Sequence, residues 1–202
     1  EANAGAYGEK RFGAGKDQEN LIYVSLGIGI GVGIILNNQL YEGHKGFAGE
    51  NGHMIISYHG EKCKCGNEGC WEAYASEYAL IKQANKKGIS QHPSLKELLH
   101  LAEHNDSVAL EIFHQIGEYI GVGITNLIKT INPKKIIIGN RLATARKYIE
   151  SSIQETVSNN NKWFSESLVQ IVFSDLETHS AAIGAATFAI DDFLSIHSTI
   201  AE

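Results

Sequence analysis

All three cysteines of the chain lie in one short, glycine-rich stretch, and this cluster constrains the fold more than any other feature. The stretch begins at His53 and contains Cys63, Cys65 and Cys70. Thiolate sulfur and imidazole nitrogen suit a soft, tetrahedral ion, and three cysteines with one histidine form a closed structural zinc set. Free thiols, with or without one disulfide, are the alternative, but the clustering of every cysteine favours a metal. We therefore predict a Zn²⁺ ion that fixes a loop.

The composition is that of a chain with a substantial core and no nucleic-acid surface. The 202 residues are 43% hydrophobic, and the net charge is −6 with lysines and arginines scattered along the sequence. Phosphate binding needs a concentrated positive face, so the composition argues against direct contact with DNA or RNA by these residues. No apolar run reaches membrane-spanning length, and the metal-like cysteine spacing suits a reducing cytoplasm.

Hydrophobic periodicity predicts a hairpin followed by alternating helices and strands. Asn37 and Asn38 mark the hairpin turn, after which residues 39–42 return antiparallel. This order predicts an α/β lobe with a mixed sheet and flanking helices. The predicted strands are 21–26, 134–139 and 168–173. The predicted helices are 2–12, 71–86, 94–103, a long one from Asn105 or Asp106 to Ile131, 142–157 and 179–194.

Residues 27–33 carry glycine at every second position. Alternating glycines leave one face of a strand bare, which allows a ligand or another backbone to approach closely. A glycine-rich strand and turn can also present backbone N–H groups to an anion. The run lacks the Lys-Ser/Thr of a Walker loop and the strand-to-helix context of a dinucleotide fingerprint. The structural and the phosphate-binding interpretations both stay open.

Two glutamates flank the predicted metal loop. Glu50 precedes His53 by three residues, and Glu72 follows the last cysteine by two. A metal-stiffened loop would hold both carboxylates in place, and convergent acceptors suit the hydroxyl groups of a sugar. A metal-bound histidine can also donate through its second ring nitrogen. Solvated glutamates are the commoner alternative, and the nearby His44 and His59 remain alternative metal ligands.

This arrangement of glutamates, histidine and cysteines resembles the signature of the ROK family of repressors, open reading frames and sugar kinases. The resemblance covers nearly the whole chain, includes the closing Ala182-Ile-Gly-Ala-Ala186 segment, and is strongest to the xylose-responsive repressors of the family. It implies the C-terminal lobe of an actin-like, ribonuclease H-like fold with a zinc-bound loop. The implied Zn²⁺ ligands are His53, Cys63, Cys65 and Cys70, and the implied sugar-binding residues are Glu50, His53 and Glu72.

Three departures from the kinase pattern of the family indicate a sensor in place of an enzyme. Glu1 stands where the kinases have a catalytic aspartate, so its carboxylate lies one methylene further out. The kinase phosphate loop reads Gly-Thr-Gly, whereas Ile28 occupies the middle position here and cannot donate a hydrogen bond. The paired glycines that follow the buried strand in kinases are replaced by Gly139-Asn140-Arg141. We therefore expect no catalytic residues and no phosphoryl transfer, with an ATP-dependent sugar kinase as the alternative.

The resemblance also implies how the domains are organised. Residues 1–202 would form the sugar-sensing, oligomerising lobe, with a DNA-binding domain and an N-terminal lobe upstream of this chain. We expect a sugar, most readily xylose, as the small-molecule ligand, and operator DNA as a partner of the upstream domain. The remaining expectations are a homodimer or higher homo-oligomer, no membrane association and a cytoplasmic location.

Overall fold

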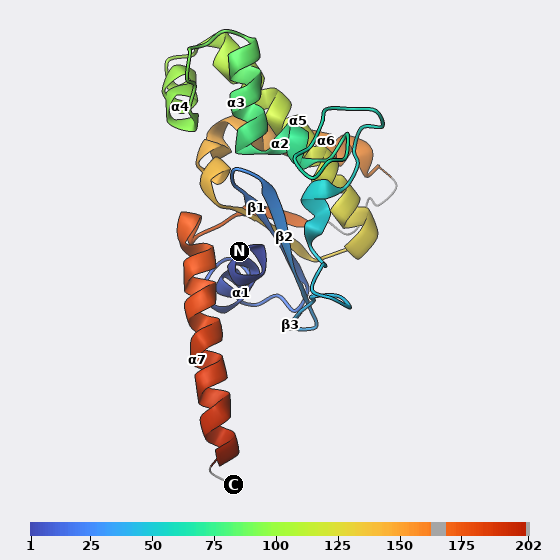
Figure 1. The fold of residues 1–202 in the computed structure, drawn as a ribbon, viewed down its shortest axis with the longest axis vertical. Helices are drawn as coiled ribbons and strands as arrows, with labels where there is room; N and C mark the ends of the chain where they lie inside the picture. Colours follow the sequence, from blue (N-terminus) through green and yellow to red (C-terminus); the bar gives the residue numbers. More distant parts are fainter. Residues whose placement is uncertain (163–168, 201–202) are drawn as a thin grey trace.

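The computed structural model describes residues 1–162 and 169–200, and a mixed five-stranded sheet organises it (Figure 1). The strand order is β3-β2-β1-β4-β5; β1 pairs antiparallel with β2 and parallel with β4, and β4 pairs parallel with β5. β3 pairs antiparallel with β2 at the edge of the sheet. The strand bounds are β1 Leu21–Leu26, β2 Ile30–Leu36, β3 Gln39–Leu40, β4 Lys135–Gly139 and β5 Gln170–Phe173.

The helices cover both faces of this sheet because the side chains of β1 alternate between two cores. Ile22 and Val24 lie in the larger core, which the long α5 contributes to, and Leu21 and Tyr23 lie in the smaller core under α1. The α-helices are α1 Ala2–Phe12, α2 Glu72–Ala75, α3 Glu77–Lys86, α4 Leu95–Glu103, α5 Ser107–Ile131, α6 Arg146–Asn160 and α7 Ser180–Ile200. The 3₁₀ turns are η1 Glu50–His53, η2 Arg141–Ala145 and η3 Glu177–His179.

The first and last helices pack together at very short distance. A Cβ atom on Gly184 of α7 would lie 1.7 Å from the carbonyl oxygen of Ala4 in α1, so only glycine allows this approach. The fully buried Glu9 of α1 accepts a hydrogen bond from Ser180 Oγ at 2.7 Å and another from Ser174. Figure 1 shows α7 continuing well beyond the sheet. The contact therefore fixes where this long helix leaves the body of the lobe.

The predicted α/β lobe and most of its elements are confirmed. Asn37 and Asn38 form the hairpin turn with φ of 53° and 65°, and Asp106 caps α5 by accepting from the N–H groups of two residues in its first turn. The single helix predicted over 71–86 is wrong, because Ser76 ends α2 and caps α3 through its side chain. The helix predicted from 142 begins instead as η2, and residue 168 of the last predicted strand lies outside the described residues.

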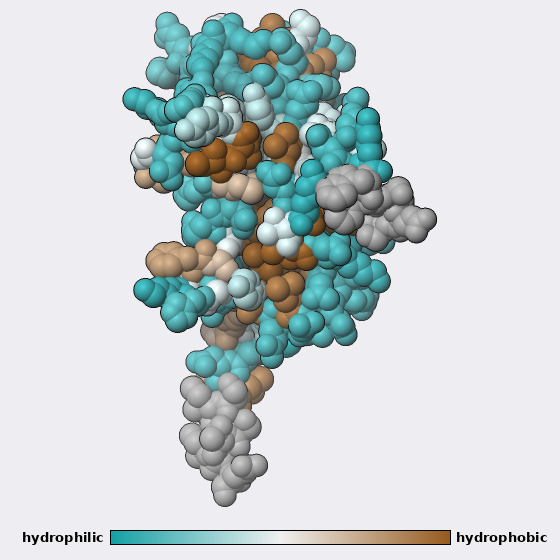
Figure 2. Space-filling view, turned by 90° about the vertical axis from the view of Figure 1, so that its right-hand side faces the viewer, coloured by the Kyte–Doolittle hydropathy of each residue, from teal (hydrophilic) through white to brown (hydrophobic). Residues whose placement is uncertain are grey.

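The segment between β3 and α2 contributes Trp71 to the larger core, with Met54 and Ile56 partly buried against it. Phe47, Ile55 and Tyr58 lie in it and are exposed. On the face shown in Figure 2, hydrophilic residues cover most of the surface and hydrophobic residues gather in patches at mid-height. Over the described residues, no helix combines the length and apolarity needed to cross a membrane. The segment must therefore be held by constraints other than a large apolar core.

Replacing Gly184 by alanine tests the packing of α7 on α1. We expect the Gly184→Ala variant to lose about 1–3 kcal/mol of the free energy of unfolding, because the new methyl group would overlap the α1 backbone. Chemical denaturation monitored by circular dichroism measures this. Ala185→Ser adds an atom at the exposed neighbouring position and should change the free energy by less than about 0.5 kcal/mol. Equal stability of the two variants would contradict the packing argument.

Candidate metal centre and adjoining cleft

The predicted metal ligands come together in space. The ligand atoms of His53, Cys63, Cys65 and Cys70 all lie within 4.8 Å of one another. Cys65 Sγ lies 3.7 Å from Cys70 Sγ, and Cys63 Sγ lies 3.6 Å from His53 Nδ1. Bonds of about 2.3 Å to sulfur and about 2.0 Å to nitrogen in a tetrahedron separate such ligand atoms by about 3.5–3.8 Å. The donor set and its spacing therefore fit a tetrahedral metal ion.

The loop that carries the cysteines is built from short backbone hydrogen bonds. The N–H of Cys63 donates to the carbonyl of Asn67 at 2.8 Å, and the N–H of Gly69 donates to Glu61 at 2.8 Å. Burial raises the pKa of Cys70 to about 12, whereas a backbone hydrogen bond at Asn67 lowers the pKa of Cys65. A metal cation would favour the thiolate form of all three cysteines.

Trp71 anchors the loop to the protein core. Its side chain is fully buried, and its indole N–H donates to the carbonyl oxygen of Tyr119 in α5 at 2.8 Å. Its backbone N–H donates to Met54 at 2.8 Å, which joins the two ends of the loop. The residue after Cys70 is thereby held in place whether or not an ion is bound.

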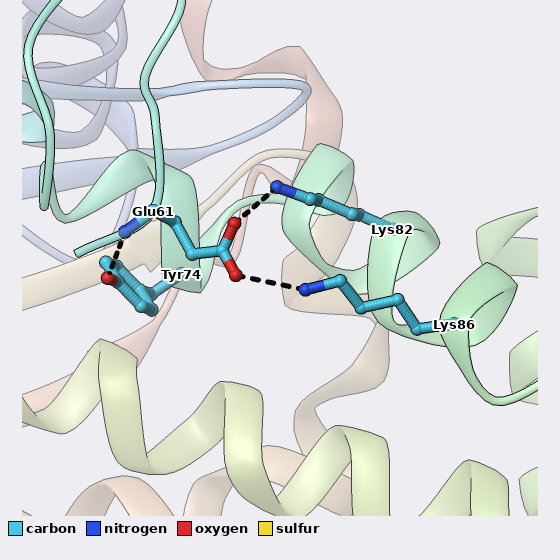
Figure 3. Close-up of polar contacts among 4 residues, drawn as sticks. All are labelled: Glu61, Tyr74, Lys82 and Lys86. Atoms are coloured by element: carbon cyan, nitrogen blue, oxygen red, sulfur yellow. Dashed lines mark hydrogen bonds and ion pairs between the residues drawn. The ribbon is translucent and has the colours of Figure 1, made fainter.

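An ion-pair cluster joins Glu61, which precedes the first cysteine by two residues, to α3 (Figure 3). The carboxylate of Glu61 accepts hydrogen bonds from Lys82 at 2.6 Å and from Lys86 at 3.0 Å. The backbone N–H of Glu61 donates to the hydroxyl oxygen of Tyr74 at 2.6 Å. Hydrogen bonds from Lys82 and then Lys86 lower the pKa of Glu61 to about 2. Two lysines one helical turn apart thus hold the start of the cysteine loop.

Glu72 links the loop of predicted metal ligands (residues 53–70, the metal loop) to the sheet. Its Oε2 atom accepts a hydrogen bond from the backbone N–H of Ile30 at 2.9 Å, at the start of β2. Its Oε1 atom lies 4.0 Å from Cys63 Sγ. A Cβ on Gly29 would lie 2.2 Å from Oε2, so the bare glycine face accommodates this carboxylate. The structural interpretation of the alternating glycines is correct at this position.

A cleft of about 360 Å³ lies beside Glu72, at the carboxyl ends of β1 and β4. The tight turn between β1 and β2 forms one wall, and the side chain of Ile28 at its tip is exposed. The N–H groups of Glu77 and Tyr78 in α3 donate to the carbonyls of Gly27 and Ile28 at 3.0 and 3.4 Å. The polar side chains that line the cleft are those of Glu1, Ser25, Glu72, Asn140 and Arg141.

Of the three predicted sugar-binding residues, Glu72 lines this cleft, whereas His53 and Glu50 lie outside its lining. His53 Nδ1 and Glu72 Oε1 lie 3.6 and 4.0 Å from Cys63 Sγ. Glu50 begins η1, which packs against β2 and ends at His53, and its side chain is exposed. The structure thus brings His53 and Glu72 to the same cysteine and leaves Glu50 one short turn away.

Two parts of the site do not follow from local sequence patterns. Ser25 carries no motif, although it is buried and lies at the end of β1. Glu61 pairs with Lys82 and Lys86, which lie 21 and 25 residues further along the chain. The sequence signal for this pair is the spacing of the two lysines, which places both on one face of a helix. Ser25 contacts Glu1 and Asn140, and Glu61 contacts Lys82 and Lys86, all of which are distant in the sequence.

Comparison with known proteins agrees with this geometry. The sequence profile of the ROK family matches residues 1–192. The xylose repressor of Bacillus subtilis is 42% identical over 196 residues, which cover 97% of this chain and 50% of the repressor. A ROK family transcriptional regulator, a homologue of the E. coli MLC protein, has a TM-score of 0.80 and 30% identity over 92% of this chain and 49% of its own. A ROK family glucokinase from Streptomyces griseus, solved with glucose and AMPPNP, has a TM-score of 0.84 and 29% identity over 93% of this chain and 65% of its own.

Fold, cysteine cluster and cleft define an actin-like lobe with a loop whose histidine and three cysteines could hold a metal ion, and the chain belongs to the ROK family. The chain spans about half the length of the curated repressor that it matches. Because the family includes both regulators and glucokinases, membership alone does not assign the activity.

The ion pairs of Glu61 predict a pH-dependent contribution to stability. The pKa of Glu61 is lowered from 4.5 to about 2 in the folded chain, so the contribution is complete above pH 4.5 and disappears as the pH falls towards 2. We expect Glu61→Gln to lower the free energy of unfolding at pH 7 by about 0.5–1 kcal/mol, the range for partly exposed ion pairs. Urea unfolding at pH 7 and at pH 3.5 measures the difference, which should shrink at the lower pH.

Glu68→Gln is the matched control, because Glu68 lies in the same loop and is exposed. This variant should unfold as the parent chain does at both pH values. If the two variants are equally destabilised, loss of a loop charge explains the effect and the ion pairs do not.

Proposed function

We propose that this chain is the sugar-binding part of a ROK transcriptional repressor that responds to xylose and has no catalytic activity. The observation that carries the proposal is the composition of the cleft, which combines the carboxylates of Glu1 and Glu72 with the hydrocarbon side chain of Ile28 at the tip of the turn. Carboxylates accept hydrogen bonds from sugar hydroxyls, and a hydrocarbon tip offers no donor to a phosphate. The similarity to the Bacillus subtilis xylose repressor supports the same assignment.

The proposed sugar contacts are Glu50, His53 and Glu72, and the proposed ion is Zn²⁺ held by His53 and the three cysteines. Coordination through His53 Nδ1, the atom nearest Cys63, would leave Nε2–H to donate to a sugar hydroxyl. The ion would have a structural role and supply no reaction chemistry, since four protein ligands close its coordination shell. Glu72 would transmit the position of the loop to the cleft through its bond to Ile30.

The proposed mechanism is a shift between two arrangements of the complete protein. Sugar would favour an arrangement in which an N-terminal lobe closes over the cleft, and this would re-space the DNA-binding domains of a homodimer or higher homo-oligomer in the cytoplasm. A coupling free energy of about 1–3 kcal/mol between sugar and operator DNA is typical of such linkage. Residues 1–202 would supply the sugar-sensing and oligomerising surfaces.

The rival function is an ATP-dependent sugar kinase, which the similarity to the Streptomyces griseus glucokinase favours. A coupled assay for ATP consumption with D-xylose and D-glucose tests it on the longest natural polypeptide that contains this chain. Sugar-dependent turnover of about 1 per second or faster would establish the kinase and overturn the proposal.

Binding to operator DNA tests the proposed function directly. We expect the complete protein to bind its operator, and D-xylose to weaken this binding by about 5- to 150-fold, the range that corresponds to typical allosteric coupling. Fluorescence anisotropy with a labelled operator measures the affinity, and D-glucose is the control sugar. Tight operator binding that neither sugar changes would refute the sugar-sensing assignment.

Replacement of one cysteine tests the role of the metal. We expect Cys65→Ser to lose bound zinc and the response to xylose together, because the loop that positions His53 and Glu72 would lose its closed ligand set. Metal analysis and the operator assay report the two effects separately. His59→Ala removes the exposed histidine near the loop and should retain both properties. Loss of zinc with an unchanged response to xylose would show that the ion does not support the sugar site.

A further inference from the structure

Asn140 adopts a backbone conformation that is almost restricted to glycine. Its φ is 72° and its ψ is −170°, directly after the buried strand β4. A residue with a Cβ atom in this region is strained and persists only where the surrounding structure holds it. Such strain at the edge of a cleft points to a role for the side chain that glycine could not fulfil.

Both polar atoms of the Asn140 side chain form hydrogen bonds, and these bonds define the orientation of the amide. Its Oδ1 atom accepts from the backbone N–H of Arg141 at 2.8 Å. Its Nδ2 atom donates to Glu1 Oε1 at 2.6 Å and to Ser25 Oγ at 2.9 Å. Ser25 Oγ also donates to Glu1 Oε1 at 3.3 Å. Two donors therefore converge on one oxygen of Glu1 and leave Oε2 as an acceptor at the cleft.

The same arrangement leaves the cleft unsuited to a polyanion. Glu1 and Glu72 both line it, and the guanidinium of Arg141 is paired with Glu77 at 2.8 Å, a carboxylate whose side chain is only 5% exposed. N–H groups at the start of a helix often bind phosphates. In α3 the N–H groups of Glu77 and Tyr78 already donate to the turn carbonyls of Gly27 and Ile28. A neutral compound rich in hydroxyl groups matches the acceptors that remain, whereas a nucleotide phosphate would meet two carboxylates and one cation, Arg141, that is already paired with Glu77.

We propose that Asn140 is a positioning and specificity-determining residue, which uses a strained backbone to hold Glu1 as an acceptor for a sugar hydroxyl and thereby adapts the cleft to neutral polyols and against nucleotide phosphates. The inference deepens the proposed function and rests on it, because the ligand class is the sugar assigned to this cleft. It adds the residue that follows β4 to a site whose other predicted members, Glu50, His53 and Glu72, lie in η1 and α2.

Two substitutions separate the positioning role from a structural one. Asn140→Gly removes both the amide and the strain, so we expect a higher midpoint of thermal unfolding and a D-xylose affinity at least about tenfold weaker. Asn140→Ala removes the amide and keeps the strain, so we expect a lower midpoint and a similarly weakened affinity. Isothermal titration and differential scanning calorimetry on the longest natural polypeptide that contains this chain measure both quantities.

Each outcome decides between the alternatives. If Asn140→Gly binds xylose as tightly as the wild-type protein does, the residue has no role in positioning and the inference is refuted. Wild-type binding of ATP with an affinity equal to that of xylose would also overturn the exclusion of nucleotide phosphates. Failure of the wild-type protein to bind any sugar would instead refute the proposed function itself, and the inference with it. Weakened affinity in both variants, with opposite shifts of the midpoint, would support the positioning role.

Discussion

The parallel pairing of β1 with β4 is the interaction on which the rest of the site depends. The register sets Ser25 opposite Gly139, so the residue that follows β4 comes to lie beside the end of β1. The pairing is held by fully buried side chains such as Ile22, Val24 and Ile138. Because the carboxyl ends of parallel strands meet at one edge of a sheet, polar residues placed after them converge without any local motif. The cleft is a direct consequence of this register.

The metal loop depends on the sheet in turn. Its segment is rich in glycine and exposes several large hydrophobic residues, so it buries too little apolar surface to fix its own conformation. Three attachments replace a core: the indole of Trp71, the ion pairs of Glu61, and the bond from Glu72 to Ile30. Glu61 precedes the three cysteines in the sequence, and Trp71 and Glu72 follow them. An ion bound by the four ligands would therefore close a structure that the protein has already oriented towards the cleft.

The sequence allowed the fold to be predicted wherever a local pattern determines the structure. Runs of β-branched residues marked the strands, and Asp106 marked the start of the longest helix. The break at Ser76 was missed because its capping side chain interrupts a segment whose apolar spacing continues on both sides. The cysteine cluster was predictable since its members are close in sequence. The bond between Glu1 and Asn140 joins residues 139 positions apart, and the packing of α1 on β1 and β2 together with the pairing of β1 and β4 brings them together.

The choice between a neutral sugar and a phosphate in this cleft depends on few atoms. Strand order and helix packing are shared with proteins described as a glucokinase and as a transcriptional regulator, so the scaffold does not decide the chemistry. The decision lies in the groups that face the cleft. A turn whose N–H groups were free would attract an anion, but here the turn carbonyls accept from α3 and the tip is a hydrocarbon. Glu1 and Glu72 add negative charge at both ends of the turn, and Glu77 neutralises the nearby Arg141. The strain at Asn140 would be a cost without benefit in a site that binds phosphate. In a site for hydroxyl groups it holds a carboxylate acceptor in place, which explains why the strained conformation is compatible with function.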